Sequence, residues 1–121
     1  MIVGDTMFSK KNLHDIPVEE TSHASGTRKM IVAKEETTSS YFEAHTYGYM
    51  PAGAKYEMHE HNNIVEICVV TKGKGIIRDD KGNEEAFVTG DRFIFPSNTQ
   101  HEIENNSAEE AEFYFFRFKN E

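Results

Sequence analysis

Four residues of the types that bind transition metals stand in the middle of the chain. His59 and His61 are separated by one residue, Glu66 follows five positions later, and His101 comes after a proline-containing turn. Imidazole nitrogens and carboxylate oxygens are ligands for iron, manganese, nickel, cobalt, copper and zinc. A site for one divalent transition metal ion is therefore the first functional hypothesis.

The spacing of these residues suits extended backbone. In a β-strand, residues i and i+2 point to the same side, so His59 and His61 can converge on one ion. Glu66 shares its side of an apolar run with Cys68 and Val70. An ionised carboxylate among apolar neighbours needs a partner, and a metal ion supplies one. His101 alternates with glutamates in the same way, which predicts that His101 faces inward.

The elements that must position these residues are short strands separated by turns, the pattern of an all-β sandwich or barrel. No segment shows a helical stripe of 10 or more residues. We predict one all-β domain over residues 29–121 and, over residues 1–28, an irregular polar arm with room for one short strand. The candidate strands span residues 29–33, 41–50, 64–71, 75–78, 85–88, 92–95, 102–105 and 112–118.

The composition of the chain excludes some classes of partner and indicates a cellular compartment. The 121-residue chain carries a formal net charge of −8, so nucleic acid and anionic membrane surfaces are poor partners. No apolar run approaches the ~20 residues that span a bilayer. The single Cys68 excludes an internal disulfide, and the first residues lack a signal-peptide pattern. We therefore expect a cytoplasmic protein.

The residues around the first histidine pair fit a family motif. The chain resembles the cupin superfamily, in particular its small single-domain members of the cupin 2 type. The first cupin motif is G-x5-H-x-H-x3,4-E-x6-G. Here it is present as Gly53, His59, His61, Glu66 and Gly73.

The second cupin motif, G-x5-P-x-G-x2-H-x3-N, surrounds the last histidine. Here it is present as Gly90, Pro96, Asn98, His101 and Asn105. Asn98 replaces a turn glycine. This change is mild, because asparagine tolerates the left-handed conformation best after glycine.

The resemblance implies a double-stranded β-helix, a jelly-roll-like barrel of two packed antiparallel sheets. It also implies a metal ion in the lumen near one mouth, held by His59, His61, Glu66 and His101. Cupins are usually dimers, often through exchanged N-terminal strands. We therefore expect a homodimer in which the arm over residues 1–28 could be exchanged.

Other candidate residues carry weaker arguments. His14, His23 and His45 stand alone and are expected to have no part in the chemistry. Cys68 is expected to be a small buried apolar residue. Glu57 lies two residues before His59, so it is a candidate general base if both side chains face inward.

The wall of the predicted pocket follows from alternation in two strands. In residues 41–50 the even positions are mostly small or apolar, which favours an inward side with Thr46 nearest the metal. In residues 112–118, Phe113 and Phe115 are expected to face the lumen. Such an apolar pocket suits a small organic ligand. The outward side of residues 64–71 is also apolar, which indicates cover by a second sheet or a partner subunit.

Three imidazoles and one carboxylate in an octahedral shell leave about two positions open on the ion. These positions can take dioxygen or a substrate that chelates through adjacent oxygens. The leading hypothesis is a metal-dependent enzyme for a small oxygen-chelating molecule, with the dioxygenase, isomerase or lyase chemistry that similar cupins perform. The alternative is a cupin that binds a sugar or an acid without catalysis.

Overall fold

The computed structural model describes residues 8–21 and 26–121, and almost all of its regular structure is β. Two single turns of 3-10 helix are present, η1 (Leu13–Asp15) and η2 (Lys34–Glu36). The strands are β1 (Val18–Glu20), β2 (Thr27–Ala33), β3 (Phe42–Met50), β4 (Lys55–Glu60), β5 (Ile64–Lys72), β6 (Lys74–Asp79), β7 (Glu84–Val88), β8 (Arg92–Phe95), β9 (Gln100–Glu104) and β10 (Ala111–Lys119).

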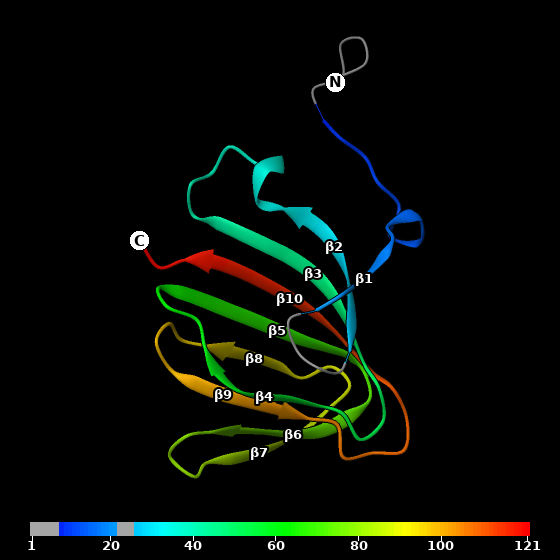
Figure 1. The fold of residues 1–121 in the computed structure, drawn as a ribbon, viewed down its shortest axis with the longest axis vertical. Coiled ribbons are helices and arrows are strands. Elements are labelled where there is room, and N and C mark those ends of the chain that lie inside the picture. The colour runs from blue at the N-terminus through cyan, green and yellow to red at the C-terminus, as the bar shows by residue number, and fades with distance from the viewer. Residues whose placement is uncertain (1–7, 22–25) are drawn as a thin grey trace.

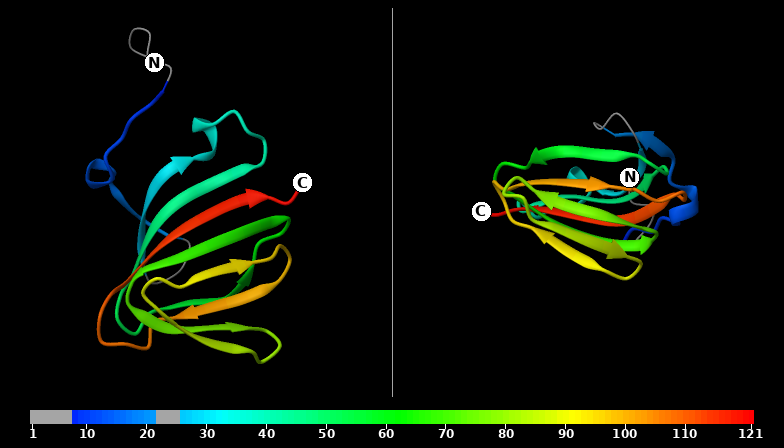
Figure 2. Two further views of the ribbon diagram at one scale, coloured as in Figure 1. Left: turned by 180° about the vertical axis from the view of Figure 1, so that it is seen from behind. Right: turned by 90° about the horizontal axis from the view of Figure 1, so that it is seen from below.

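The strands form two antiparallel sheets that face one another (Figures 1 and 2). The six-stranded sheet has the order β1-β2-β3-β10-β5-β8, and the four-stranded sheet has the order β4-β9-β6-β7. The chain crosses repeatedly between the sheets, so strands distant in sequence become neighbours. The predicted all-β class and the double-stranded β-helix are both confirmed.

All eight predicted strands are present with small differences at their ends; β4 was missed, and β1 is a short strand in the arm whose position was not predicted. β4 escaped detection because its pairing with β9 is interrupted by a register shift between Tyr56 and His59, which disturbs the alternation of buried and exposed residues. β1 is three exposed residues long and has no alternation to detect.

The arm is more ordered than its sequence indicated. β1 pairs antiparallel with β2 of the same chain, with Glu19 opposite Arg28. The boundary expected between residues 28 and 29 therefore falls inside β2. Exchange of this arm within a homodimer stays a prediction, which sedimentation velocity would test.

The core between the sheets is apolar at the end away from the histidines. Met50, Val70, Phe87 and Phe113 are all at most 1% exposed. Burial of each such side chain contributes about 1.5–3 kcal/mol. The backbone of β6 approaches this cluster so closely that a Cβ on Gly75 would overlap the Phe87 ring, which explains a glycine in mid-strand.

Asn105 closes the same end of the barrel. Its fully buried side-chain amide donates to the carbonyl oxygens of Met50 at 3.1 Å, Pro51 at 3.1 Å and Glu109 at 2.7 Å. Its oxygen accepts from the backbone and the hydroxyl of Ser107. This last residue of the second cupin motif therefore connects the turn after β3 to the loop before β10 and is not a metal ligand.

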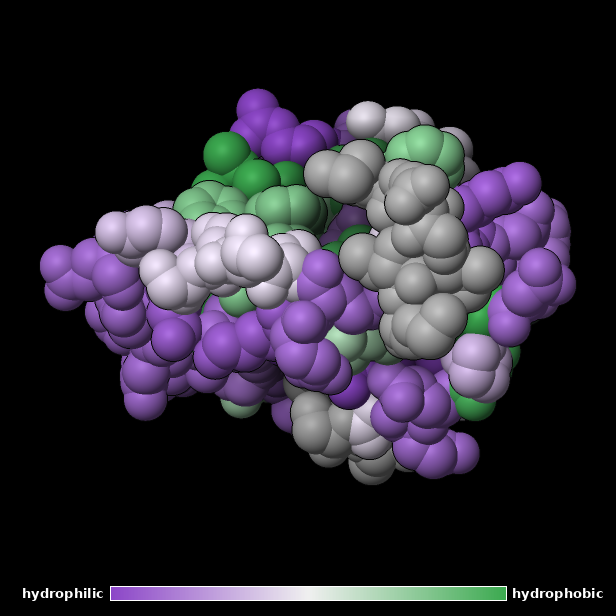
Figure 3. Space-filling view, turned by 90° about the horizontal axis from the view of Figure 1, so that it is seen from above, coloured by the Kyte–Doolittle hydropathy of each residue, from purple (hydrophilic) through white to green (hydrophobic). Residues whose placement is uncertain are grey.

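The outer side of the six-stranded sheet carries a shallow apolar groove of about 490 Å³. Leu13 and Ile16 of the arm line it together with Ile67, Val69 and Phe116. The outward apolar residues of β5 are thus partly covered by the arm of their own chain. The face of the molecule seen from above is largely hydrophilic, with hydrophobic residues in small groups (Figure 3). Within the described ranges, no helix is long and apolar enough to cross a membrane.

Candidate metal centre

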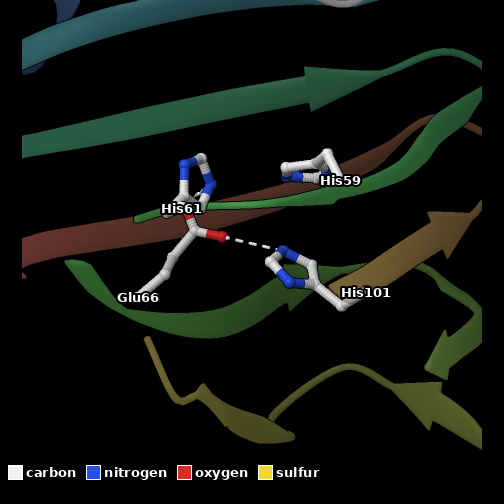
Figure 4. Close-up of side chains that lie close together, drawn as sticks. All are labelled: His59, His61, Glu66 and His101. Atoms are coloured by element: carbon white, nitrogen blue, oxygen red, sulfur yellow. Dashed lines mark ion pairs between the residues drawn. The ribbon is translucent and has the colours of Figure 1, made fainter. Parts of the chain in front are cut away.

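The four predicted ligands meet between the two sheets (Figure 4). His59 comes from β4, His61 follows that strand, Glu66 comes from β5 and His101 from β9. One ligand atom from each of them lies within 4.8 Å of all the others. Ligands bound to one ion at 2.0–2.2 Å lie roughly 3–4 Å apart, so small side-chain rotations would complete the shell.

Strand pairing brings the histidines together. His59 and His101 are directly opposite one another in the β4–β9 pair, and their ring centroids are 4.4 Å apart. The His101 ring stacks on Phe95 with centroids 3.9 Å apart and an interplanar angle of 7°. This stacking fixes the orientation of His101, which is 3% exposed.

The loop that carries His61 is held by Asn98, the residue that departs from the cupin motif. Asn98 adopts a left-handed φ of 61°, as its replacement of glycine requires. Its backbone N–H donates to the His61 carbonyl at 3.1 Å, and its side-chain oxygen accepts from the Asn63 N–H at 3.1 Å. The second bond is one that glycine could not make.

Glu66 is the buried carboxylate of the cluster and is 6% exposed. Its oxygens lie 3.4 Å from His101 Nε2, 3.7 Å from His61 Nε2 and 3.6 Å from Arg117 Nε. Burial alone would raise the pKa of Glu66, but the approach of His101 and the positive charge of Arg117 outweigh it. The pKa is lowered, so the carboxylate is ionised at neutral pH.

His59 and His61 are in the state that a metal ion requires. Burial lowers the pKa values of His59 and His61, which keeps both rings neutral at neutral pH. His59 Nδ1 lies 2.6 Å from the Glu57 carbonyl oxygen. Because a carbonyl only accepts, Nδ1 carries the proton and Nε2 presents its lone pair, an arrangement common around metal ions.

His101 provides the test of whether this cluster suits a cation. Both of its ring nitrogens are buried, and neither has a hydrogen-bond partner among the described residues. The 3.4 Å approach of Nε2 to Glu66 lacks hydrogen-bond geometry. Buried polar atoms are rarely left without a partner. A divalent transition metal ion would satisfy the lone pair of Nε2, so the donor set fits such an ion.

A cavity of about 410 Å³ opens beside the cluster. His59, His61 and Glu66 line it, and the buried His101 is not among its lining residues. Its volume is in the range of small-molecule pockets. The remaining lining residues are Thr21, Arg28, Thr46, Gly48, Tyr56, Glu60, Ile103, Phe115 and Arg117.

Of the three residues predicted to form the pocket wall, two line the cavity and one does not. Thr46 and Phe115 line the cavity, and Thr46 is 3% exposed. Phe113 also faces inward but is fully buried in the apolar core, where its ring packs against Phe87. It supports the wall from behind and is not among the lining residues.

The side chain of Glu57 does not share the inward side with His59, so the expectation behind its role as general base is wrong. Glu57 is exposed and does not line the cavity, whereas its neighbour Tyr56 is buried and does. The register shift between Tyr56 and His59 breaks the two-residue period on which the expectation rested. The contribution of Glu57 to the site is its backbone carbonyl.

Two arginines of the cavity were missed. Arg117 follows Phe113 and Phe115 at two-residue intervals, so a continued alternation along β10 could have found it. Arg28 is one of the first two residues of β2, which fall within the range expected to be the irregular arm.

Three of the residues with weaker arguments lie outside the cluster of four candidate ligands. His14 is exposed in η1, and His45 lies on the outer side of the six-stranded sheet. Cys68 is fully buried, and burial raises the pKa of its thiol. His23 lies outside the described residues.

Comparison with solved structures finds the same fold at low sequence identity. A predicted oxalate decarboxylase from Thermotoga maritima has a TM-score of 0.80 and 21% identity, covering 89% of this chain and 96% of that one. The polyketide cyclase RemF from Streptomyces resistomycificus has values of 0.79 and 15%, covering 95% and 81%. A cupin-superfamily sugar phosphate isomerase from Silicibacter pomeroyi has values of 0.73 and 20%, covering 92% and 76%.

No protein with a curated function matches this sequence. The cupin-domain family model matches residues 46–117, which is more than half of the chain and includes all four candidate ligands. The chain therefore belongs to the cupin family.

Proposed function

We propose that this cupin holds one divalent transition metal ion and is an enzyme for a small organic molecule that chelates through oxygen. The supporting observation is the cluster of His59, His61, Glu66 and His101, whose ligand atoms lie within 4.8 Å of one another beside a cavity of about 410 Å³. Three neutral imidazoles and one carboxylate leave a divalent ion with a net positive charge.

The bound ion would supply Lewis acidity or, if redox-active, oxygen activation. The residues of the chain prepare the site for it. Glu66, His59 and His61 are already in the deprotonated states that bind metal. Ile103 and Phe115 give the cavity an apolar part of its wall. Burial raises the pKa of Tyr56, so its phenol keeps its proton at the cavity wall.

The proposal includes three types of reaction, which are dioxygenase, isomerase and lyase chemistry. The structural relatives support this breadth, since they include a predicted decarboxylase, a cyclase and an isomerase. The exposed position of Glu57 favours the alternative, a cupin that binds a sugar or an acid without catalysis, because it removes the expected general base from the cavity.

Elemental analysis tests the metal site. Protein purified without added metal is expected to retain about one transition metal ion per chain, and His101→Ala to lower metal affinity at least tenfold. His14→Ala is the matched control, because it removes an exposed imidazole distant from the cluster. Undiminished stoichiometric metal in His101→Ala would refute the site.

A substrate screen separates the enzyme from the binding protein. Metal-loaded protein is offered diketones, unsaturated uronates and other oxygen chelators, and both heat release on binding and product formation are measured. Turnover that disappears in His101→Ala supports the enzyme. Saturable binding with no turnover of any compound supports the alternative.

A further inference from the structure

We propose that the cavity takes an anionic substrate whose carboxylate is bound by Arg117, with Arg28 as a second cationic contact. This inference rests on the proposed function, because it names the substrate class of the same metal site. The juxtaposition that carries it is a pair of arginines lining the cavity of a chain whose net charge is −8.

Arg117 lies directly beside the candidate ligands. It faces Glu66 across the β10–β5 pair and Ala44 across the β10–β3 pair. Its side chain is 24% exposed, and its Nε lies 3.6 Å from Glu66 Oε2, beyond hydrogen-bond distance. Within residues 8–21 and 26–121, Glu66 is the single ion-pair partner of Arg117, and Arg117 makes no side-chain hydrogen bond.

This partner is already shared. The Glu66 carboxylate also lies within 3.7 Å of His61 Nε2 and His101 Nε2, and in the proposed site it binds the ion. A guanidinium has five N–H donors, and ligation of a metal by Glu66 would commit the charge nearest to Arg117. The remaining donors of Arg117 are then available to a ligand in the cavity.

Arg28 adds a second cationic group on the same wall. It lies opposite Gly48 in the β2–β3 pair, and both residues line the cavity. Its Nε donates to Glu19 Oε1 of β1 at 3.0 Å, which anchors the guanidinium at the edge of the six-stranded sheet. This bond uses Nε and leaves the two terminal nitrogens of the guanidinium available to a ligand in the cavity.

The charges of the cavity favour an anion. The lining arginines, Arg28 and Arg117, balance the lining carboxylates, Glu60 and Glu66. With neutral imidazoles, a bound divalent ion therefore leaves the cavity net positive. The planar fork of arginine matches a carboxylate through two parallel hydrogen bonds. A ligand with metal-chelating oxygens and a carboxylate would satisfy both halves of the site.

The test uses malonate and its neutral diamide, malonamide, which have the same number of heavy atoms. Binding to manganese-loaded protein is measured by calorimetry for the wild type and for Arg117→Gln, after elemental analysis has matched their metal contents. Arg117→Gln is expected to weaken malonate binding by about tenfold and to leave malonamide binding within about twofold. Arg28→Gln is expected to act in the same direction more weakly, because Arg28 is already paired with Glu19.

Two variants serve as controls. Arg92→Gln makes the same change in charge at an exposed position of β8 outside the cavity lining, and it is expected to leave both affinities unchanged. Arg117→Lys keeps the positive charge beside Glu66 but lacks the planar fork. It is expected to fold even if Arg117→Gln does not, and to lose about threefold in malonate affinity.

An unchanged ratio of malonate to malonamide affinity in the folded Arg117 variants would overturn the inference. A loss of manganese affinity with that ratio preserved would also overturn it, because Arg117 would then position Glu66 and not bind substrate. Failure of the proposed function looks different, since the wild type would then hold no metal that depends on His101. Malonate can also be added to metal-free protein. Arg117→Gln is then expected to lower the rise in melting temperature that malonate produces.

Discussion

The two sides of the six-stranded sheet are formed by alternate residues of the same strands, and they differ in what they contain. On the inner side, β5 presents Glu66, Cys68 and Val70, which are all at most 6% exposed. On the outer side, it presents Ile67 and Val69 to a shallow groove. Both sides of β5 are thus rich in apolar residues, yet the inner side alone carries a candidate ligand.

The histidines show the same contrast. His45 of β3 lies on the outer side among Tyr114 and Phe116, and its ring centroids are 5.7 and 5.6 Å from theirs. His101 lies between the sheets, 3% exposed, with two other imidazoles and a carboxylate nearby. Burial of an imidazole does not by itself make a site. Convergence with other ligands does, and convergence depends on which side of the sheet a residue occupies.

The largest expected effect separates two phenylalanines of β10. Phe113 on the inner side is fully buried, whereas Phe116 on the outer side is 37% exposed. Phe113→Ala is expected to lower the free energy of unfolding by about 3–5 kcal/mol, because it removes an aromatic ring and leaves a cavity. Urea denaturation of the metal-free protein, followed by circular dichroism, measures the change.

Phe116→Ala is the matched comparison in the same strand. Since part of its ring is already in water, its loss is expected to cost about 1–1.5 kcal/mol. Equal losses from the two substitutions would contradict the difference between the two sides of the sheet.

A smaller effect is expected for a polar contact of the outer side. Tyr47 Oη lies 2.7 Å from Thr71 Oγ1 and donates to Glu112 Oε1 at 2.8 Å. Burial raises the pKa of Tyr47 to about 12, so its hydroxyl keeps its proton at neutral pH. Tyr47→Phe is expected to lower the free energy of unfolding by about 1 kcal/mol, measured by urea denaturation. Metal content should not change, and a loss of metal would show that the outer side supports the site.

The smallest expected effect is a change in pH dependence. Burial lowers the pKa of His45 in the folded protein, while the unfolded chain titrates near the ordinary value of about 6.5. The unfolded state therefore binds the proton more readily, and stability falls as pH drops below about 6.5. Tyr114 and Phe116 supply no compensating charge, and the cationic Lys11 lines the same groove.

His45→Gln is expected to reduce this loss of stability, because glutamine does not titrate. Urea denaturation of metal-free protein at several pH values from about 5 to 8 compares the two slopes. Protonation of His59 and His61 also lowers the stability of the protein in acid, so the informative quantity is the difference between wild type and variant. Parallel curves would show that His45 is solvated in the folded state.

Much of the candidate site could be predicted from the sequence. His101 and Glu66 were expected to face inward because apolar and polar residues alternate around them, and both do. Asn98 was expected to tolerate a left-handed turn, and its φ of 61° confirms this. These predictions succeeded because the direction of a side chain along a regular strand is a local property of the backbone.

The errors occurred where that local rule was interrupted. Glu57 was expected to face inward with His59, but the register shift in β4 turns it to solvent. Arg28 was overlooked because β2 begins two residues before the expected domain boundary. Phe113 was assigned to the pocket wall, although the depth of a residue within the barrel depends on what packs against it from the opposite sheet.

The sequence by itself determined the kinds of ligand, their order and the side of the strand from which Glu66 and His101 project. It could do so because side-chain alternation and ligand chemistry need no information from distant residues. The tertiary structure alone decided that His59 stands opposite His101 and that Arg117 approaches Glu66 within 3.6 Å. Those relations depend on the pairing register of strands far apart in sequence, which is set by packing over the whole barrel.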